Sequence, residues 1–234
     1  TSSPKLVSKI LPAEPNPGYL GDADSGMDLE DSNDHWPADI ASTYSQYEIV
    51  FESYATNFVN HPVENLLGKK NIYGVSGTWP DSQDPLLLTR GYDNATYSIA
   101  SNGDSFAPSI SSGVDREGCL ISFENCINNS IRGRYMVFAS TATNLDPDIQ
   151  ESSYANGSVN IFLLDRDADN DQALDEYTQA GAIRIYLITK DYGSTELPAN
   201  GVSDNPVISA NGKYIAFQST STRLDPKDSD TVKD

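Results

Sequence analysis

The feature that most constrains this fold is an internal repeat. Three stretches align without gaps: EIVFESYATNF from Glu48, YMVFASTATNL from Tyr135 and YIAFQSTSTRL from Tyr214. Each has an apolar pair, a Phe, one variable residue, a Ser and a short polar turn, and the shared aromatic residues are Phe51, Phe138 and Phe217. Self-similarity at a long period is typical of architectures that stack one supersecondary unit several times. We therefore expect this chain to repeat one structural unit.

Strand signals surround each copy of the repeat. Short β-branched and aromatic runs precede the copies at 37–41, 108–111 and 206–209, follow the first two at 71–75 and 160–165, and recur at 85–90 and 183–189. Clusters of Gly, Pro, Asn, Asp and Ser separate them, and helical periodicity is nearly absent. The pattern predicts an all-β chain of four-stranded antiparallel units. Its alternating core residues should be Ile49, Phe51, Ile72, Met136, Phe138, Ile161, Ile183, Ile215 and Phe217.

Four short strands cannot bury both faces of a sheet alone, and stacking such sheets around an axis gives a β-propeller. We predict a single propeller segment of about three blades, with units near 1–58, 59–145 and 146–234 and loop insertions at 15–36, 112–132 and 165–182. KLVS at 5–8 is similar to an isolated fourth strand. A closed ring usually needs about four to eight blades. The ring is therefore expected to be incomplete: either the chain belongs to a longer protein, or neighbouring chains complete its blades by strand addition.

The repeat also resembles a known family. NPVISANGKYIAFQSTSTRLDPKDSD from Asn205, and GRYMVFASTATNLDPD followed by NIFLLDRDAD, are similar to the PD40 or TolB-type WD40-like repeats of bacterial β-propellers. Those repeats typically read P-S-I-S-x-D-G-R-Y-V-A-F-x-S-x-A-T-N-L-x-P and then D-x-F-x-x-D-R. The first unit matches less well, because STYSQ replaces the D-G turn. The resemblance implies a propeller fold and says little about activity, since propellers host many functions.

Residues 165–176, DRDADNDQALDE, concentrate acidic side chains. Numbered as a twelve-residue loop, they place carboxylates at positions 1, 3, 5, 7 and 12: Asp165, Asp167, Asp169, Asp171 and Glu176. Calcium takes six to eight hard oxygens at about 2.3–2.6 Å, and this spacing wraps them around one point. Asn170 holds position 6, where Gly is usual, and Asn tolerates left-handed backbone well. The stretch resembles the calcium loops D-x-D-x-D-G-D-G-x-x-D-E inserted in such propellers, so it predicts a structural Ca²⁺ site; the alternative is a solvated acidic turn.

Two cysteines and three sequons bear on the compartment. Cys119 and Cys126 are too far apart for a C-x-x-C pair, and we expect them to form a local disulfide in an oxidising compartment, with two buried free thiols as the alternative. The N-x-S/T sequons predict glycosylation at Asn94, Asn128 and Asn156. Both features fit an extracellular chain.

The charge balance limits the partners. Asp and Glu number 34 against 15 Lys and Arg, which gives a formal charge of −19. Phosphate binding needs basic residues in excess, so nucleic acid is excluded as a partner. No apolar run approaches the roughly 20 residues of a membrane helix, so membrane insertion is not expected. Divalent-cation sites, a saline habitat or solubility can each account for the acidity.

No motif predicts catalysis. The chain lacks a G-x-S-x-G nucleophile signature, and its many carboxylates single out no glycosidase pair. We therefore predict a non-enzymatic extracellular or cell-surface protein that serves as a calcium-stabilised structural, adhesive or self-assembly module with a protein partner. Two alternatives remain: the propeller domain of a larger secreted hydrolase such as a peptidase, and a periplasmic TolB-like protein-binding module.

Overall fold

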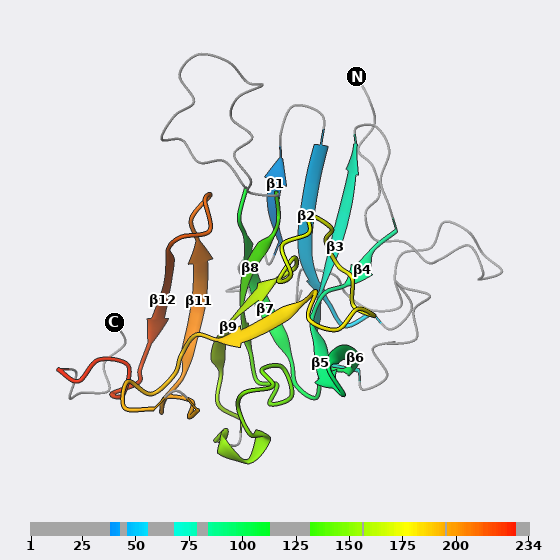
Figure 1. Ribbon diagram of the computed structural model, residues 1–234. Helices are drawn as coiled ribbons and strands as arrows, with labels where there is room; N and C mark the ends of the chain where they lie inside the picture. The colour runs from blue at the N-terminus through cyan, green and yellow to red at the C-terminus, as the bar shows by residue number, and fades with distance from the viewer. Residues whose placement is uncertain are drawn as a thin grey trace.

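The computed structural model describes residues 38–42, 46–55, 68–78, 84–112, 132–155, 157–194 and 196–227 (Figure 1). Its elements are β1 (Ala38–Ser42), β2 (Gln46–Ser53), β3 (Asn71–Thr78), β4 (Leu86–Leu87), β5 (Arg90–Asp93), β6 (Thr96–Ala100), β7 (Ser105–Ile110), β8 (Tyr135–Ser140), the 3₁₀ turn η2 (Glu151–Ser153), β9 (Asn160–Asp165), β10 (Arg184–Leu187), β11 (Ser203–Ile208) and β12 (Ile215–Ser219). No α-helix occurs in this part of the chain. The all-β prediction is confirmed.

The strands form four antiparallel sheets. β1–β2–β3–β4 is the first sheet and β7–β8–β9–β10 the second, each with neighbours in chain order. β11–β12 is a third sheet with two strands among the described residues, and β5–β6 is a separate hairpin. Each four-stranded sheet therefore combines strands from two of the predicted sequence units.

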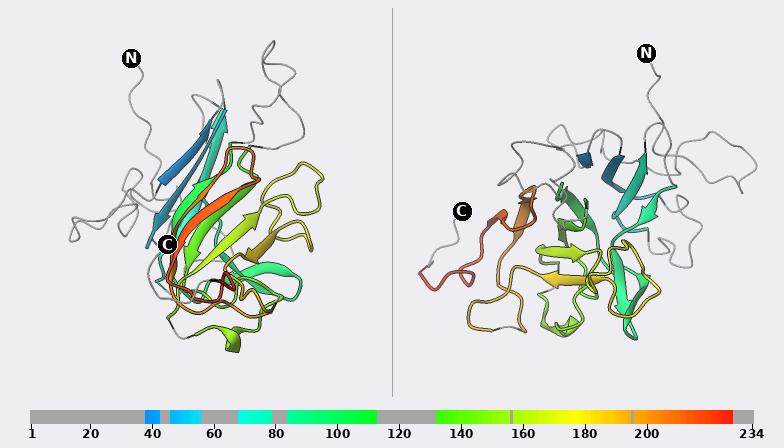
Figure 2. Two further views of the ribbon diagram at one scale, coloured as in Figure 1. Left: turned by 90° about the vertical axis from the view of Figure 1, so that its left-hand side faces the viewer. Right: turned by 45° about the horizontal axis from the view of Figure 1, so that its top comes forward.

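The second sheet lies between the first and the third sheets (Figures 1 and 2). On one side, β7 packs against β1, β2 and β3, and the Asp39 carboxylate accepts a hydrogen bond from the Ile110 amide at 2.8 Å. On the other side, β11 packs against β7, β8 and β9, and the Ile208 amide donates to Ser109 Oγ at 3.3 Å. β7 thus joins the first and third sheets.

The repeat keeps one register in all three sheets. Two residues before each shared Phe, the same type of apolar cross-strand pair recurs: Ile40 with Ile49, Ile110 with Met136 and Ile208 with Ile215. In the two four-stranded sheets the Phe also stacks on an aromatic residue of the next strand, Phe51 on Tyr73 with ring centroids 5.9 Å apart and Phe138 on Phe162 with centroids 5.8 Å apart. Aromatic cross-strand pairs of this kind stabilise a sheet.

Most of the predicted core in the four-stranded sheets is confirmed. Six of the expected residues are buried: Phe51, Ile72, Met136, Phe138, Ile161 and Ile183. Ile49, Ile215 and Phe217 are only half-buried. Ile215 and Phe217 lie on β12, which in the described part of the chain has β11 as its only strand neighbour.

Several sequence predictions fall outside the described residues. These are the disulfide between Cys119 and Cys126, the sequons at Asn128 and Asn156, the strand at 5–8 and the insertion at 15–36. The remaining sequon, Asn94, lies exposed in the turn of the hairpin β5–β6, with φ 45°. Its accessibility suits a modified residue, and its glycosylation stays a prediction.

Candidate metal centre

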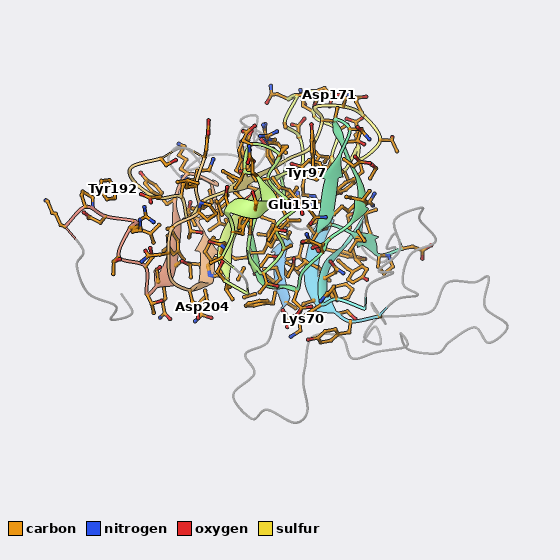
Figure 3. The ribbon with its side chains drawn as sticks, turned by 90° about the horizontal axis from the view of Figure 1, so that it is seen from below. Lys70, Tyr97, Glu151, Asp171, Tyr192 and Asp204 are labelled. Atoms are coloured by element: carbon orange, nitrogen blue, oxygen red, sulfur yellow. The ribbon has the colours of Figure 1, made fainter. Side chains whose placement is uncertain are left out.

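The acidic loop, residues 165–176, begins with the last residue of β9 and runs toward β10. Figure 3 shows Asp171 at the margin of the molecule, far from the labelled Asp204 and Lys70. The backbone is left-handed at Asn170 (φ 60°), Gln172 (φ 77°) and Asp175 (φ 66°). The left-handed conformation expected at Asn170 is therefore confirmed, and three such residues give the loop its tight path.

Three aspartates converge in this loop. Asp167, Asp169 and Asp171 each offer a carboxylate oxygen, and these atoms all lie within 4.8 Å of one another. Asp167 is fully buried, with 0% of its surface exposed, whereas Asp169 and Asp171 are exposed. Amides of the loop hold the side chains in place, since Gln172 N donates to Asp167 Oδ1 at 3.2 Å and Ala173 N donates to Asp171 Oδ1 at 2.8 Å. The group can hold a metal ion.

Two buried carboxylate oxygens in the loop accept no hydrogen bond from the described residues: Oδ2 of Asp167 and Oε2 of Glu176. The Asp167 atom forms an ion pair with Nη1 of Arg134 at 3.4 Å, so Glu176 Oε2 is the one without a partner of either kind among the described residues. Burial and the negative charges of Asp171, Asp169 and Asp167 raise the pKa of Glu176. Buried oxygens without a donor are costly. A cation bound between these carboxylates would neutralise their repulsion and give Glu176 Oε2 the partner that it lacks among the described residues.

Asp165 has a different partner from the other predicted ligands. Its carboxylate accepts from Arg134 Nε at 2.8 Å and from Arg134 Nη2 at 3.1 Å, and the Asp167 amide donates to it at 3.1 Å. The hydrogen bond that Arg134 donates to Asp165 is the main cause that raises the pKa of Arg134. Arg134 Nη1 also donates to Asn170 Oδ1 at 2.8 Å. The structure thus separates Asp165 from the group of three aspartates.

Arg134 is a site residue that the sequence did not predict. It precedes Tyr135, and Tyr135 pairs with Asp165 across strands β8 and β9. The signal that could have found it is the register of the two repeat strands, because that register brings the Gly-basic-Tyr turn next to the end of β9.

A buried ionic cluster lies behind the loop. The guanidinium of Arg166 pairs with Glu48 Oε1 of β2 at 2.8 Å and makes a bidentate contact with Asp175, with Nε to Oδ1 at 2.7 Å. Nη1 also donates to the Gly133 carbonyl at 2.9 Å. Burial opposes the charge of Arg166, but Asp175 and Glu48 outweigh it and raise its pKa.

Tyr177 fixes the end of the loop. Its buried hydroxyl donates to the Leu88 carbonyl at 2.9 Å, and its ring packs against the Arg90 guanidinium with 3.8 Å between Cζ and the ring centroid. A desolvated Arg over an aromatic face is a favourable cation–π contact, on the order of 2 kcal/mol. Leu88 follows β4, so this contact joins the loop to the edge of the first sheet.

Comparisons with other proteins add no further constraint. No protein-family model matches the chain, and searches of curated proteins and of solved structures return no match. In the described part of the chain, no helix has the length and hydropathy of a membrane span. The resemblance to PD40 repeats therefore stays a prediction from the repeat motifs.

Proposed function

We propose that this chain is a segment of a β-propeller, and that it works as a non-catalytic extracellular or cell-surface module braced by Ca²⁺. Two antiparallel sheets with strands in chain order, and a third strand pair of the same register beside them, support the propeller arrangement. Packing of β7 against both neighbouring sheets supports it further, because adjacent blades contact each other face to face.

The ion is proposed to be Ca²⁺. All its proposed ligands are carboxylates, which are hard oxygen donors, and calcium accepts the irregular geometry that a flexible loop supplies. The observation that carries the proposal is the convergence of the Asp167, Asp169 and Asp171 carboxylates, together with the buried Glu176 Oε2, which accepts no hydrogen bond from the described residues. Asp165 is left out of the proposed ligands, because its carboxylate already accepts hydrogen bonds from Arg134 and from the Asp167 amide.

The module is proposed to bind protein, including other copies of itself. In the described part of the chain, β12 pairs with β11 alone, so its other edge is open to a further strand. Nearby apolar side chains are exposed, Val207 by 56% and Tyr214 by 73%. Open strand edges bind extended segments through backbone hydrogen bonds.

Isothermal titration calorimetry tests the calcium site. We expect wild type to bind Ca²⁺, and Asp169→Asn and Asp171→Asn each to weaken binding by about tenfold or more, because the charge of the ligands sets the affinity. Both side chains are exposed, so the variants should fold. Asp225→Asn removes the same charge from an exposed loop residue elsewhere and should bind like wild type. Equal binding by all four proteins, or none by wild type, would contradict the proposed site.

Light scattering on the same samples tests self-association. Particles larger than the 25.4 kDa chain, which shrink when a chelator removes Ca²⁺, support assembly braced by the ion. Monomers both with Ca²⁺ and with chelator would contradict the self-association part of the proposal and leave the calcium site to be judged by calorimetry.

A further inference from the structure

The acidic loop and the residue after it carry two sets of side chains with different partners. Asp167, Asp169, Asp171 and Glu176 carry the carboxylates of the proposed metal site. The residues interleaved with them or next to them, Arg166, Asp175 and Tyr177, instead form contacts that lead to the first sheet. One short segment therefore takes part in both the metal site and the junction between the first and second sheets.

The junction contacts are buried and long-range. Arg166 reaches Glu48 on β2, and Tyr177 reaches Leu88 after β4, 89 residues away in sequence. The side chain of Arg166 is 2% exposed and that of Glu48 is 6% exposed. Desolvated ion pairs and hydrogen bonds depend steeply on geometry, because a small displacement leaves a charge or a donor without its partner. These contacts therefore require the loop to keep its present conformation.

That conformation is unfavourable without a ligand. Left-handed backbone at Gln172 and Asp175 is uncommon for residues other than Gly. The carboxylates that gather in the loop also repel one another. Asp175 lies between the last two proposed ligands, Asp171 and Glu176, and forms the bidentate contact with Arg166. The backbone path that assembles the metal site is thus the same path that delivers Asp175 and Tyr177 to the junction.

We propose that the acidic loop is a metal-linked clamp: cation binding by Asp167, Asp169, Asp171 and Glu176 is thermodynamically coupled to docking of the first sheet against the second through Arg166 and Tyr177. This inference rests on the calcium site of the proposed function. A ligand that binds only one conformation stabilises all contacts of that conformation, and such coupling is reciprocal. Calcium should therefore tighten the junction, and damage to the junction should weaken calcium binding.

Hydrogen–deuterium exchange of the wild-type chain, with Ca²⁺ and with chelator, tests the first half of the coupling. We expect Ca²⁺ to slow amide exchange in the acidic loop and also in 46–53 and 86–90, which carry Glu48 and Leu88. Amides of β11 and β12, which lie on the other side of the second sheet, should exchange equally fast in both conditions. Slower exchange confined to 165–177 would overturn the clamp and leave the metal site standing. Absence of Ca²⁺ binding in calorimetry would overturn both.

Tyr177→Phe tests the reciprocal half. It removes the hydroxyl that donates to the Leu88 carbonyl and leaves every proposed ligand in place. We expect its Ca²⁺ affinity to fall about fivefold or more, the lower end of typical coupling between sites. We also expect Ca²⁺ to slow amide exchange in 86–90 less than it does in wild type. Tyr154→Phe is the matched control, because the Tyr154 hydroxyl is buried without a hydrogen-bond partner in the described part of the chain. Equal Ca²⁺ affinity in the two variants would overturn the coupling.

Discussion

The second sheet and the third sheet carry the same repeat, yet their equivalent residues differ in burial. Phe138 and Leu145 are fully buried in the second sheet, whereas their counterparts Phe217 and Leu224 are half-buried. Asp146 of NLDPD is buried, while Asp225 of RLDPK is exposed. The two regions share the repeat motif at these positions, and what surrounds them differs.

Local structure is the same in both regions. Gly133 and Gly212 lie just before the second strand of each pair, with φ 71° each. A serine pair joins those strands in both, Ser105 with Ser140 at 3.0 Å and Ser203 with Ser219 at 2.9 Å. A bulge recurs before each proline, with Ala107 at φ 51° and Asn205 at φ 50°. The two strand pairs therefore share these local features, although only β8 has a third strand beside it among the described residues.

The second sheet gains its core from β9 and β10. Phe162 of β9 stacks on Phe138 with centroids 5.8 Å apart. The Leu187 amide of β10 donates to Asp146 Oδ2 at 2.8 Å. The described part of the chain supplies the third sheet with no equivalent of these strands. The repeat motif therefore determines a strand pair, and the strands that follow it determine how much that pair stabilises the protein.

The largest effect is expected from truncating the shared Phe in each region. Phe138→Ala should lower the free energy of unfolding by about 3–5 kcal/mol, because it leaves a cavity in a fully packed core. Phe217→Ala should lower it by about 1 kcal/mol, since a half-buried side chain loses less contact and leaves no closed cavity. Urea unfolding followed by fluorescence measures both. Equal losses would show that burial does not distinguish the two regions.

A smaller difference in stability loss is expected between variants of the equivalent aspartates of the two repeats, Asp146 and Asp225. Asp146→Ala should cost about 2–3 kcal/mol, because it leaves the buried Leu187 amide without an acceptor and removes the ion pair with Arg184. Asp225→Ala should change stability by about 0.5 kcal/mol or less, as is usual for exposed side chains. Differential scanning calorimetry of both variants checks the contrast. A loss at Asp225 as large as that at Asp146 would mean that a further strand covers Asp225 in solution.

Much of the fold could be predicted because the information is local. Phe51, Phe138 and Phe217 mark the second strand of each sheet, and alternating apolar residues mark their neighbours. The serine at the end of each of these strands accepts a hydrogen bond from the amide two residues on, as at Ser140 and Ala142. These features depend on residues a few positions apart, so a single sequence reveals them.

The rest depends on pairs distant in sequence. Asp165 was assigned to the metal ligands by spacing, and nothing in the loop itself indicates that Arg134, 31 residues earlier, takes its carboxylate. The pairing of Glu48 with Arg166 requires two sheets to be placed first. The hairpin β5–β6 was missed for a different reason: its turn residues, Asn94 and Ala95, were interpreted only as part of a sequon.

Glu48 extends the comparison to the first sheet, and its expected effect is the smallest. It precedes Phe51 by three residues, where the second and third repeats have Tyr135 and Tyr214. Burial raises the pKa of Glu48 above its ordinary 4.5, and the nearby Asp175 adds to this, while Arg166 and Arg132 oppose it. The first repeat therefore buries an ionisable group at a position that is aromatic in the other two.

Because its pKa is raised on folding, folded Glu48 keeps its proton at pH values where the unfolded chain has lost it. The folded state then binds more protons, so this residue's contribution to stability falls as pH rises from 4.5 through the raised pKa. Glu48→Gln cannot titrate and should remove that slope. We expect the stability of wild type relative to Glu48→Gln to decrease between pH 5 and pH 8 in urea unfolding at fixed Ca²⁺, with other carboxylates cancelling in the difference. Glu196→Gln, which changes an exposed loop residue, should follow wild type across the same range. If the difference in stability between wild type and Glu48→Gln stays constant with pH, Arg166 compensates the burial of Glu48 fully. The first repeat would then differ from the other two in residue type at this position but not in the response of its stability to pH.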